Sequence, residues 1–103
     1  MIRGTTPSLL YNLPFPSSNL KSAEITIKYE DGQKSIELTK TLEDCVLGET
    51  SIAAHLTQEE TLQFPAPSWV LVQLRVLTIN DEAMATEYEE VPVAKLLREG
   101  VIE

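Results

Sequence analysis

The sequence has a single cysteine, a single histidine, few aromatic residues and no long apolar run. Because Cys45 has no partner within the chain, internal disulfides are excluded, which favours a reducing compartment over the small secreted domains that depend on bridges. No stretch approaches the roughly 20 apolar residues of a membrane span. The first residues also lack the apolar core of a signal peptide. We therefore expect a protein made in the cytoplasm, with no membrane partner.

Basic residues are also scarce. The 103-residue chain has 8 Lys and Arg against 16 Asp and Glu, which gives a formal net charge of −8. Phosphate backbones repel such a surface, so nucleic acid is not an expected partner. The acidic clusters, Glu87 to Glu90 and the pair Glu59-Glu60, are short. We interpret them as a solvated surface.

Motifs that carry catalysis or bind cofactors are missing. No nucleophile motif surrounds His55, which we predict to lie on the surface, and Cys45 is interpreted as a core or edge residue. The four glycines are too far apart for a phosphate-binding loop. Asp81, Glu82 and the Glu87 to Glu90 cluster lack the Asp-x-Asp-x-Asp spacing of a calcium loop. We therefore expect no enzyme activity and assign no catalytic, cofactor-binding or metal residue and no cofactor.

The sequence does contain enough apolar residues for one core. Hydrophobic residues make up 43% of the chain. A chain of this length buries roughly two-thirds of the surface that it exposes when unfolded. We therefore expect residues 1–103 to form one domain.

Alternation of apolar and polar residues predicts strands in the first part of the chain. Leu9 to Phe15 alternate and end at two prolines, which is typical of an edge strand. Residues 22–30 alternate more cleanly, with Ala23, Ile25, Ile27 and Tyr29 on one face. Asp31-Gly32 then predicts a tight hairpin turn into the strand that carries Ile36 and Leu38.

The second part of the chain contains further strands and one helix. Residues 42–47 are ambiguous, and Thr50 to Leu56 reads as a short strand. Thr57 and Glu60 match a capping box, which predicts a brief helix that ends before Phe64 and bridges two sheets. The longest apolar segment, Ser68 to Asn80, is typical of a central strand covered on both faces or nearly so. Met84 to Val91 is expected to pair with it as an antiparallel hairpin.

Residues 92–100 are compatible with two structures. Val93, Leu96 and Leu97 stand at helical spacing before Gly100, which predicts a short closing helix. An added strand is the alternative. Either way, seven short segments separated by turn signals predict an all-β fold, an antiparallel β-sandwich of immunoglobulin-like or fibronectin-like size with one short helix between strands.

Exposed aromatic rings would open another possibility, because carbohydrate-binding modules share the sandwich architecture. Tyr11 and Tyr29 follow the apolar side of their strands, and Trp69 opens the most hydrophobic strand, so we expect these rings in the core or at its rim. Tyr88, between glutamates, is the best candidate for a partly exposed ring. One tyrosine does not make a sugar platform.

Several segments together resemble a known group of proteins. They are Arg3-Gly4-Thr5-Thr6-Pro7, Leu13-Pro14-Phe15, Leu56 to Leu62 with Phe64, Val72 to Leu77, and Leu96-Leu97 with Gly100-Val101-Ile102. On these segments the chain resembles small uncharacterised prophage-encoded proteins of Firmicutes. The resemblance covers nearly the whole chain. The resemblance implies a component of the virion structural region, with no catalytic residues. The sequence departs from that pattern at Phe64-Pro65-Ala66-Pro67, where a proline-stiffened link replaces a glycine-containing turn.

Three functions remain open at this point. The leading hypothesis is a non-enzymatic phage structural or accessory protein that acts through contacts with other virion components, as a possible homo-oligomer. It would be cytoplasmic when synthesised and part of the virion once assembled. The alternatives are an acidic cytoplasmic inhibitor or regulator of a basic protein, and a carbohydrate-binding module.

Overall fold

Strands make up half of the chain in the computed structural model, which describes all residues 1–103. The strands are β1 (Ser8–Asn12), β2 (Leu20–Glu30), β3 (Ser35–Thr41), β4 (Cys45–Leu47), β5 (Ser51–His55), β6 (Ser68–Thr78), β7 (Ala83–Ala85) and β8 (Glu89–Val93). One α-helix, α1 (Gln58–Leu62), and two 3-10 turns, η1 (Ser17–Asn19) and η2 (Leu42–Asp44), complete the regular structure. The prediction of an all-β fold with one short helix is confirmed.

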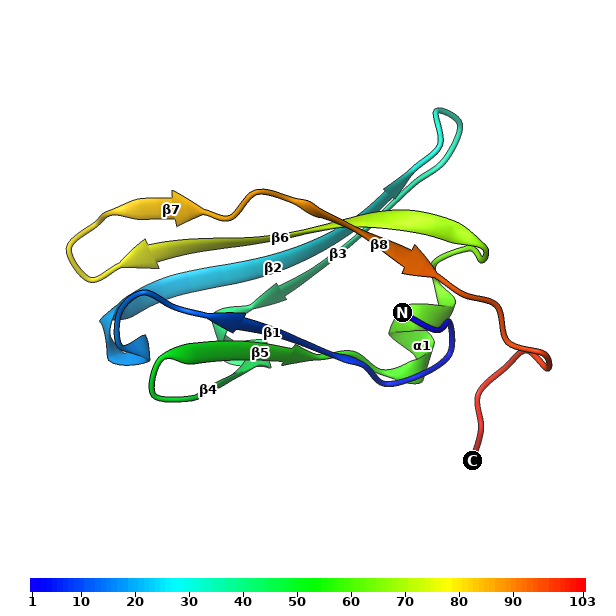
Figure 1. Cartoon of the computed structure of the whole chain (residues 1–103), viewed down its shortest axis with the longest axis horizontal. Helices are drawn as coiled ribbons and strands as arrows, with labels where there is room; N and C mark the ends of the chain where they lie inside the picture. The colour runs from blue at the N-terminus through cyan, green and yellow to red at the C-terminus, as the bar shows by residue number, and fades with distance from the viewer.

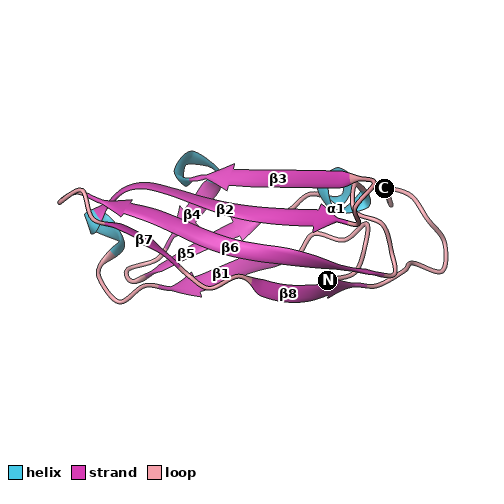
Figure 2. Ribbon diagram, turned by 90° about the horizontal axis from the view of Figure 1, so that it is seen from above, coloured by secondary structure: helices cyan, strands magenta, loops and turns pink.

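The strands form two antiparallel sheets that lie one above the other (Figure 1). The small sheet has the order β1-β5-β4. In the large sheet β3 pairs with β2 and β2 with β6, while β7 and β8 share the other edge of β6 (Figure 2). The β2–β3 hairpin stays within one sheet, whereas the second and third strands of an immunoglobulin domain lie in opposite sheets. The likeness to such domains is therefore one of layering and not of strand order.

The core lies between the two sheets. It is formed by the inward-facing residues of strands from both sheets, among them Ile25 and Ile27 of β2, Val70 and Val72 of β6 and Ile52 of β5. Thirteen buried hydrophobic residues form one cluster that draws on both sheets. Successive side chains of a strand point to opposite faces. The residues between these core residues therefore face outward.

Two local predictions are confirmed in atomic detail. At the β2–β3 turn Gly32 has a φ of 88°, and Asp31 Oδ1 accepts hydrogen bonds from the backbone N–H groups of Gln33 and Lys34. At the start of α1 the Thr57 hydroxyl accepts from the N–H of Glu60 at 3.2 Å, and Glu60 Oε1 accepts from the N–H of Thr57 at 2.8 Å. The helix follows β5 of the small sheet and precedes β6 of the large one, so it bridges the sheets as expected.

The region left ambiguous, residues 42–47, contains the 3-10 turn η2 and then β4. The strand predicted over residues 84–91 is present but interrupted at residues 86–88. There Thr86 still donates to Leu74 O at 2.9 Å, while its carbonyl accepts from the Gln73 side chain. Arg75 pairs with Ala85 and Val72 pairs with Glu89. Residues 86–88 therefore stand opposite only two residues of β6, 73 and 74. This extra residue is a bulge that divides the edge into β7 and β8.

One prediction about the strands is wrong, and one question that the sequence left open is decided. β6 is buried on one face only, because no element lies over the outer face of the large sheet. Of the two structures compatible with residues 92–100, the strand is present as far as Val93, where β8 ends, and the closing helix is absent. Ala94 forms a parallel bridge with Ile2, and residues 95–103 have no regular structure. Val93 is fully buried as a strand residue, so the helical spacing that it shares with Leu96 and Leu97 is coincidental.

Candidate interaction surfaces

The register of β1 against β5 brings together a serine and the only histidine. Ser8 pairs with His55, and the Ser8 hydroxyl hydrogen-bonds the Nδ1 atom of His55 on the outer face of the small sheet. Both residues are exposed, as predicted for His55, and no carboxylate orients the ring. A serine nucleophile needs a base held by a third group and a site for the substrate. The pair therefore has the composition of a catalytic dyad without its supporting geometry.

Cys45 opens β4 at the edge of the small sheet and is half-buried, as expected of an edge residue. Burial and the charge of the neighbouring Asp44 raise the pKa of its thiol. A raised pKa leaves less of the reactive thiolate at neutral pH. The surroundings of Cys45 are thus those of a structural thiol.

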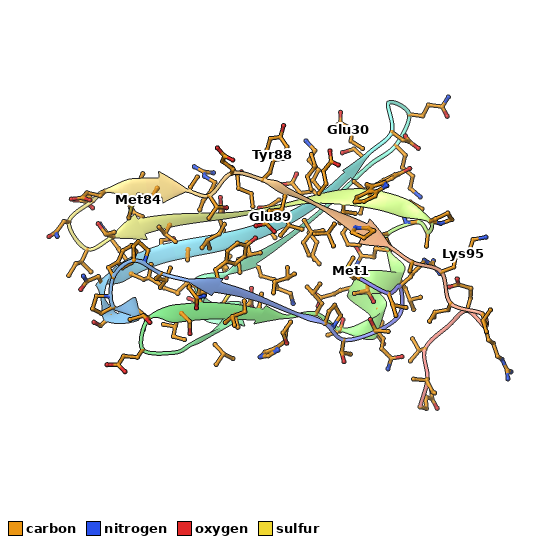
Figure 3. All side chains as sticks on the ribbon, viewed as in Figure 1. Met1, Glu30, Met84, Tyr88, Glu89 and Lys95 are labelled. Atoms are coloured by element: carbon orange, nitrogen blue, oxygen red, sulfur yellow. The ribbon has the colours of Figure 1, made fainter.

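The acidic side chains of the last third of the chain do not gather at one site. Asp81 forms an ion pair with Lys21 at 2.9 Å, and no three His, Cys, Asp or Glu side chains gather where they could hold a metal ion. Tyr88 and Glu89 point to opposite sides of the chain (Figure 3). Glu89 pairs in register with the buried Val72, so it stands on the inner side of β8, where it is exposed at the edge of the sandwich. Burial, with the nearby charge of Glu89, raises the pKa of Tyr11 on β1.

The outer face of the large sheet carries exposed apolar side chains that we call the outer stripe (Trp69, Leu71 and Tyr88). Trp69 is 61% exposed and Tyr88 is 64% exposed. The exposure of Tyr88 was predicted, whereas the expectation that Trp69 lies in the core or at its rim is wrong. Trp69 alternates with the buried Val70, and since β6 has no cover on its outer face the indole projects into solvent.

Charged side chains share the outer face of the large sheet with the outer stripe. Arg75 Nη1 lies 2.9 Å from Glu24 Oε1, and Lys28 Nζ lies 3.5 Å from Glu30 Oε2. Glu90 stands opposite Leu71 in the register of β8 against β6. An apolar centre with a polar rim is the usual anatomy of a protein interface.

The outer face of the small sheet is different, because its strands carry no acidic or basic side chain other than His55. Leu10, Ala53 and Val46 form one row across its three strands, since Leu10 and Val46 both pair with Ala53. Leu10 and Val46 are exposed. This face therefore offers a second, smaller apolar surface.

At one end of the sandwich the two sheets leave a hollow that we call the end groove. It has a volume of about 180 Å³ and lies between the segment after β1 and the β6–β7 pair. Leu13, Phe15, Leu74, Val76 and Met84 line it, and none of its lining residues is charged. A second, wider hollow of about 520 Å³ adjoins it and contains the Glu24–Arg75 ion pair.

Comparison with protein-family models, with curated proteins and with solved structures found no match for this chain. No helix of the structure combines the length and the apolar character needed to cross a membrane.

Sequence reasoning missed both the Ser8–His55 pair and the exposure of Trp69. The pair depends on the β1–β5 register, which joins residues 47 positions apart. A signal for Trp69 was nonetheless present, since Trp69, Leu71, Gln73 and Arg75 alternate with Val70, Val72 and Leu74. Period-two alternation of this kind indicates a one-sided strand even when the outward residues are apolar.

Proposed function

We propose that the protein is a non-enzymatic phage or prophage structural or accessory protein that acts through protein–protein contacts in virion assembly. The observation that carries the proposal is the outer stripe, a tryptophan, a leucine and a tyrosine in solvent on an uncovered sheet face. Trp and Tyr are enriched among the side chains that dominate binding energy at protein interfaces. The resemblance to prophage proteins is the reason for proposing virion assembly. The exposed surface supports binding to another protein and does not identify that protein.

Mass spectrometry of gradient-purified particles from an induced source strain tests this proposal. Peptides of this chain are counted against those of the major capsid and tail proteins. We expect a fixed ratio, whose value indicates the ring or tube that the protein joins. Absence from particles, with abundant protein in the soluble lysate, would overturn the proposal in favour of an acidic cytoplasmic regulator.

A matched pair of variants tests the role of the outer stripe in this setting. Trp69→Ser removes the largest exposed ring of the large sheet, and Leu10→Ser makes a comparable change on the small sheet. Loss of a central aromatic anchor at an interface costs about 2 kcal/mol or more, a factor of roughly 30 in affinity. We expect Trp69→Ser to be depleted from particles and Leu10→Ser to be retained. Equal incorporation would contradict a docking role for the outer stripe.

A carbohydrate-binding module is the second candidate, favoured by the exposure of Trp69 and Tyr88 on the large sheet. Exposed rings on a flat sheet face can stack on sugars. The single tryptophan gives a direct readout, because a sugar stacked on it would shift its fluorescence. A shift on adding one polysaccharide that is lost in Tyr88→Ala would support this candidate, and no shift across a panel of glycans would remove it.

A further inference from the structure

Residues 95–103, which we call the arm, leave the sandwich beside α1 (Figure 1). They carry exposed apolar side chains. Leu97 is fully exposed, and Ile102 is 80% exposed. Polar contacts hold the arm in place. The Gln58 side chain donates to Ile102 O and accepts from its N–H, at 3.0 and 2.8 Å, and Arg3 pairs with Glu99.

The base of the arm is packed as well. Leu96 lies against Gly4, where a Cβ atom would come within 2.7 Å of Leu96 Cδ1. Leu96 is thus tied to the body of the protein while its neighbour Leu97 points into solvent. A side chain of this size gains about 1.5–3 kcal/mol when it is fully buried. The arm therefore presents Leu97 on a held backbone, which lowers the entropy cost of docking it.

The end groove is lined in part by Met84 and Ala85 of β7. The strand β7 and the arm lie at opposite ends of the long axis (Figure 1). The groove's volume of about 180 Å³ is close to that of engineered apolar cavities, on the order of 150 Å³, that take up a small apolar group. Its rim is accessible, because Met84 is exposed. The groove thus has room for one aliphatic side chain of the size of leucine.

Charge complements this fit. Five of the eight Lys and Arg side chains form ion pairs, and the three that do not are Lys34, Lys95 and Arg98. Lys95 and Arg98 flank Leu97 on the arm. Glu82 and Glu87, which stand before and after β7 in the chain, have no ion-pair partner either. An arm seated in the groove would bring these cations towards these carboxylates.

We propose that the arm of one copy docks into the end groove of a second copy, with Leu97 in the groove. Because arm and groove lie at opposite ends, the contact is head-to-tail, and repetition of such a contact gives a ring or a filament. One leucine and its neighbours cover less than the about 800 Å² per partner of a standard interface, so a single contact is weak and closure into a ring strengthens it. This self-association goes beyond the proposed function and does not require the protein to be found in virions.

Sedimentation of the purified full chain over a wide concentration range tests the contact. We expect the average mass of the wild-type protein to rise with concentration, and to rise less in high salt because the flanking charges are screened. Leu97→Ser should weaken the association about tenfold or more. Ile102→Ser, elsewhere on the arm, should weaken it less. The matched control, Leu10→Ser on the small sheet, should associate like the wild type.

Mixing two variants distinguishes a head-to-tail contact from a symmetric one. Leu97→Ser keeps the groove, and Met84→Lys keeps the arm but places a cation at the groove rim, where it repels Lys95 and Arg98. At a concentration where the wild-type chain already forms dimers through a single contact, each variant alone should be mostly monomeric, and their mixture should form a one-to-one heterodimer that grows no further. Circular dichroism confirms that both variants are folded.

Three results would overturn the proposal. They are a wild-type chain that stays monomeric at every concentration, a Leu97→Ser variant that associates like the wild type, and a mixture that forms no heterodimer. Because these measurements use only the purified chain, they are separate from the particle analysis. If the protein is absent from virions, a positive sedimentation result still stands. If the purified chain stays monomeric, its presence in virions still stands.

Discussion

At the scale of single residues, the most enclosed ion pair joins Lys40 to Glu60 at 2.6 Å, with both side chains less than one-fifth exposed. Glu60 also closes the capping box of α1. Burial of Glu60 favours its neutral form. The hydrogen bonds from Lys40 and from the N–H of Thr57 outweigh that effect and lower the pKa of Glu60 below its usual 4.5. One carboxylate thus links the helix to β3.

This pair predicts an acid-sensitive contribution to stability. Because the pKa of Glu60 is lower in the folded state than in the unfolded chain, its contribution is complete above about pH 4.5 and is lost as pH falls through the folded value. Glu60→Gln should cost about 1–3 kcal/mol at pH 7, since Lys40 loses its partner. The difference from the wild type should shrink as pH falls. Thermal melts from pH 7 to pH 3 measure it, with the exposed Glu59→Gln as control.

The cysteine allows a second test at this scale. Burial, followed by the charge of Asp44, raises the pKa of the Cys45 thiol. We expect Cys45 to react slowly with a thiol reagent at pH 7 in the folded protein, and several-fold faster in denaturant, where neither effect operates. Equal rates in the two states would contradict the burial of this side chain.

At the scale of elements, α1 is a five-residue helix, too short to be stable alone, and depends on its cap and on packing. The Thr57 hydroxyl accepts a hydrogen bond from the N–H of Glu60. Thr57→Ala should lower the free energy of unfolding by about 0.5–2 kcal/mol, and Thr57→Ser, which keeps the hydroxyl, should recover most of it. Urea denaturation measures both. A full loss in the serine variant would show that the methyl group, and not the cap, stabilises the helix.

The edge strand β3 shows how an element is protected from unwanted pairing. Lys40 pairs in register with the buried Ile25, so it faces inward from the edge of the large sheet. An inward-pointing charge is one of the devices that discourage a further strand from adding to an edge. Glu60 supplies the counter-charge. The proposed self-association therefore relies on the arm and the end groove and not on this edge.

At the scale of the whole molecule, apolar side chains are divided between a closed core and uncovered surfaces. Phe64, at the exit of α1, is fully buried, whereas Trp69, five residues later, is mostly exposed. Phe64→Ala should cost about 3–5 kcal/mol. Trp69→Ser should change stability by no more than about 0.5 kcal/mol. Denaturation of the two variants compares them, and a large loss in Trp69→Ser would mean that the indole packs against the sandwich.

Several features could be predicted from the sequence because interactions within a few residues decide them. The Asp31-Gly32 turn needs a residue that accepts positive φ and a nearby carboxylate acceptor. The capping box at Thr57 needs two side chains three positions apart. The alternation of residues 22–30 indicates its buried face directly. The sandwich follows from these patterns, since each one-sided strand must cover its apolar face with another layer.

Other features depend on which elements lie over one another, and only the tertiary structure decided them. An apolar run such as residues 68–80 has the same local sequence whether one face or both are covered, and here the outer face has no cover. Pairing with β6 decides the burial of Val93 and Leu97. It places Val93 in the core and does not extend to Leu97, which is exposed. The Ser8–His55 pair and the end groove join segments far apart in the chain. The sequence alone determined the local turns, caps and strand faces, whereas long-range pairing decided which apolar side chains were left for partners.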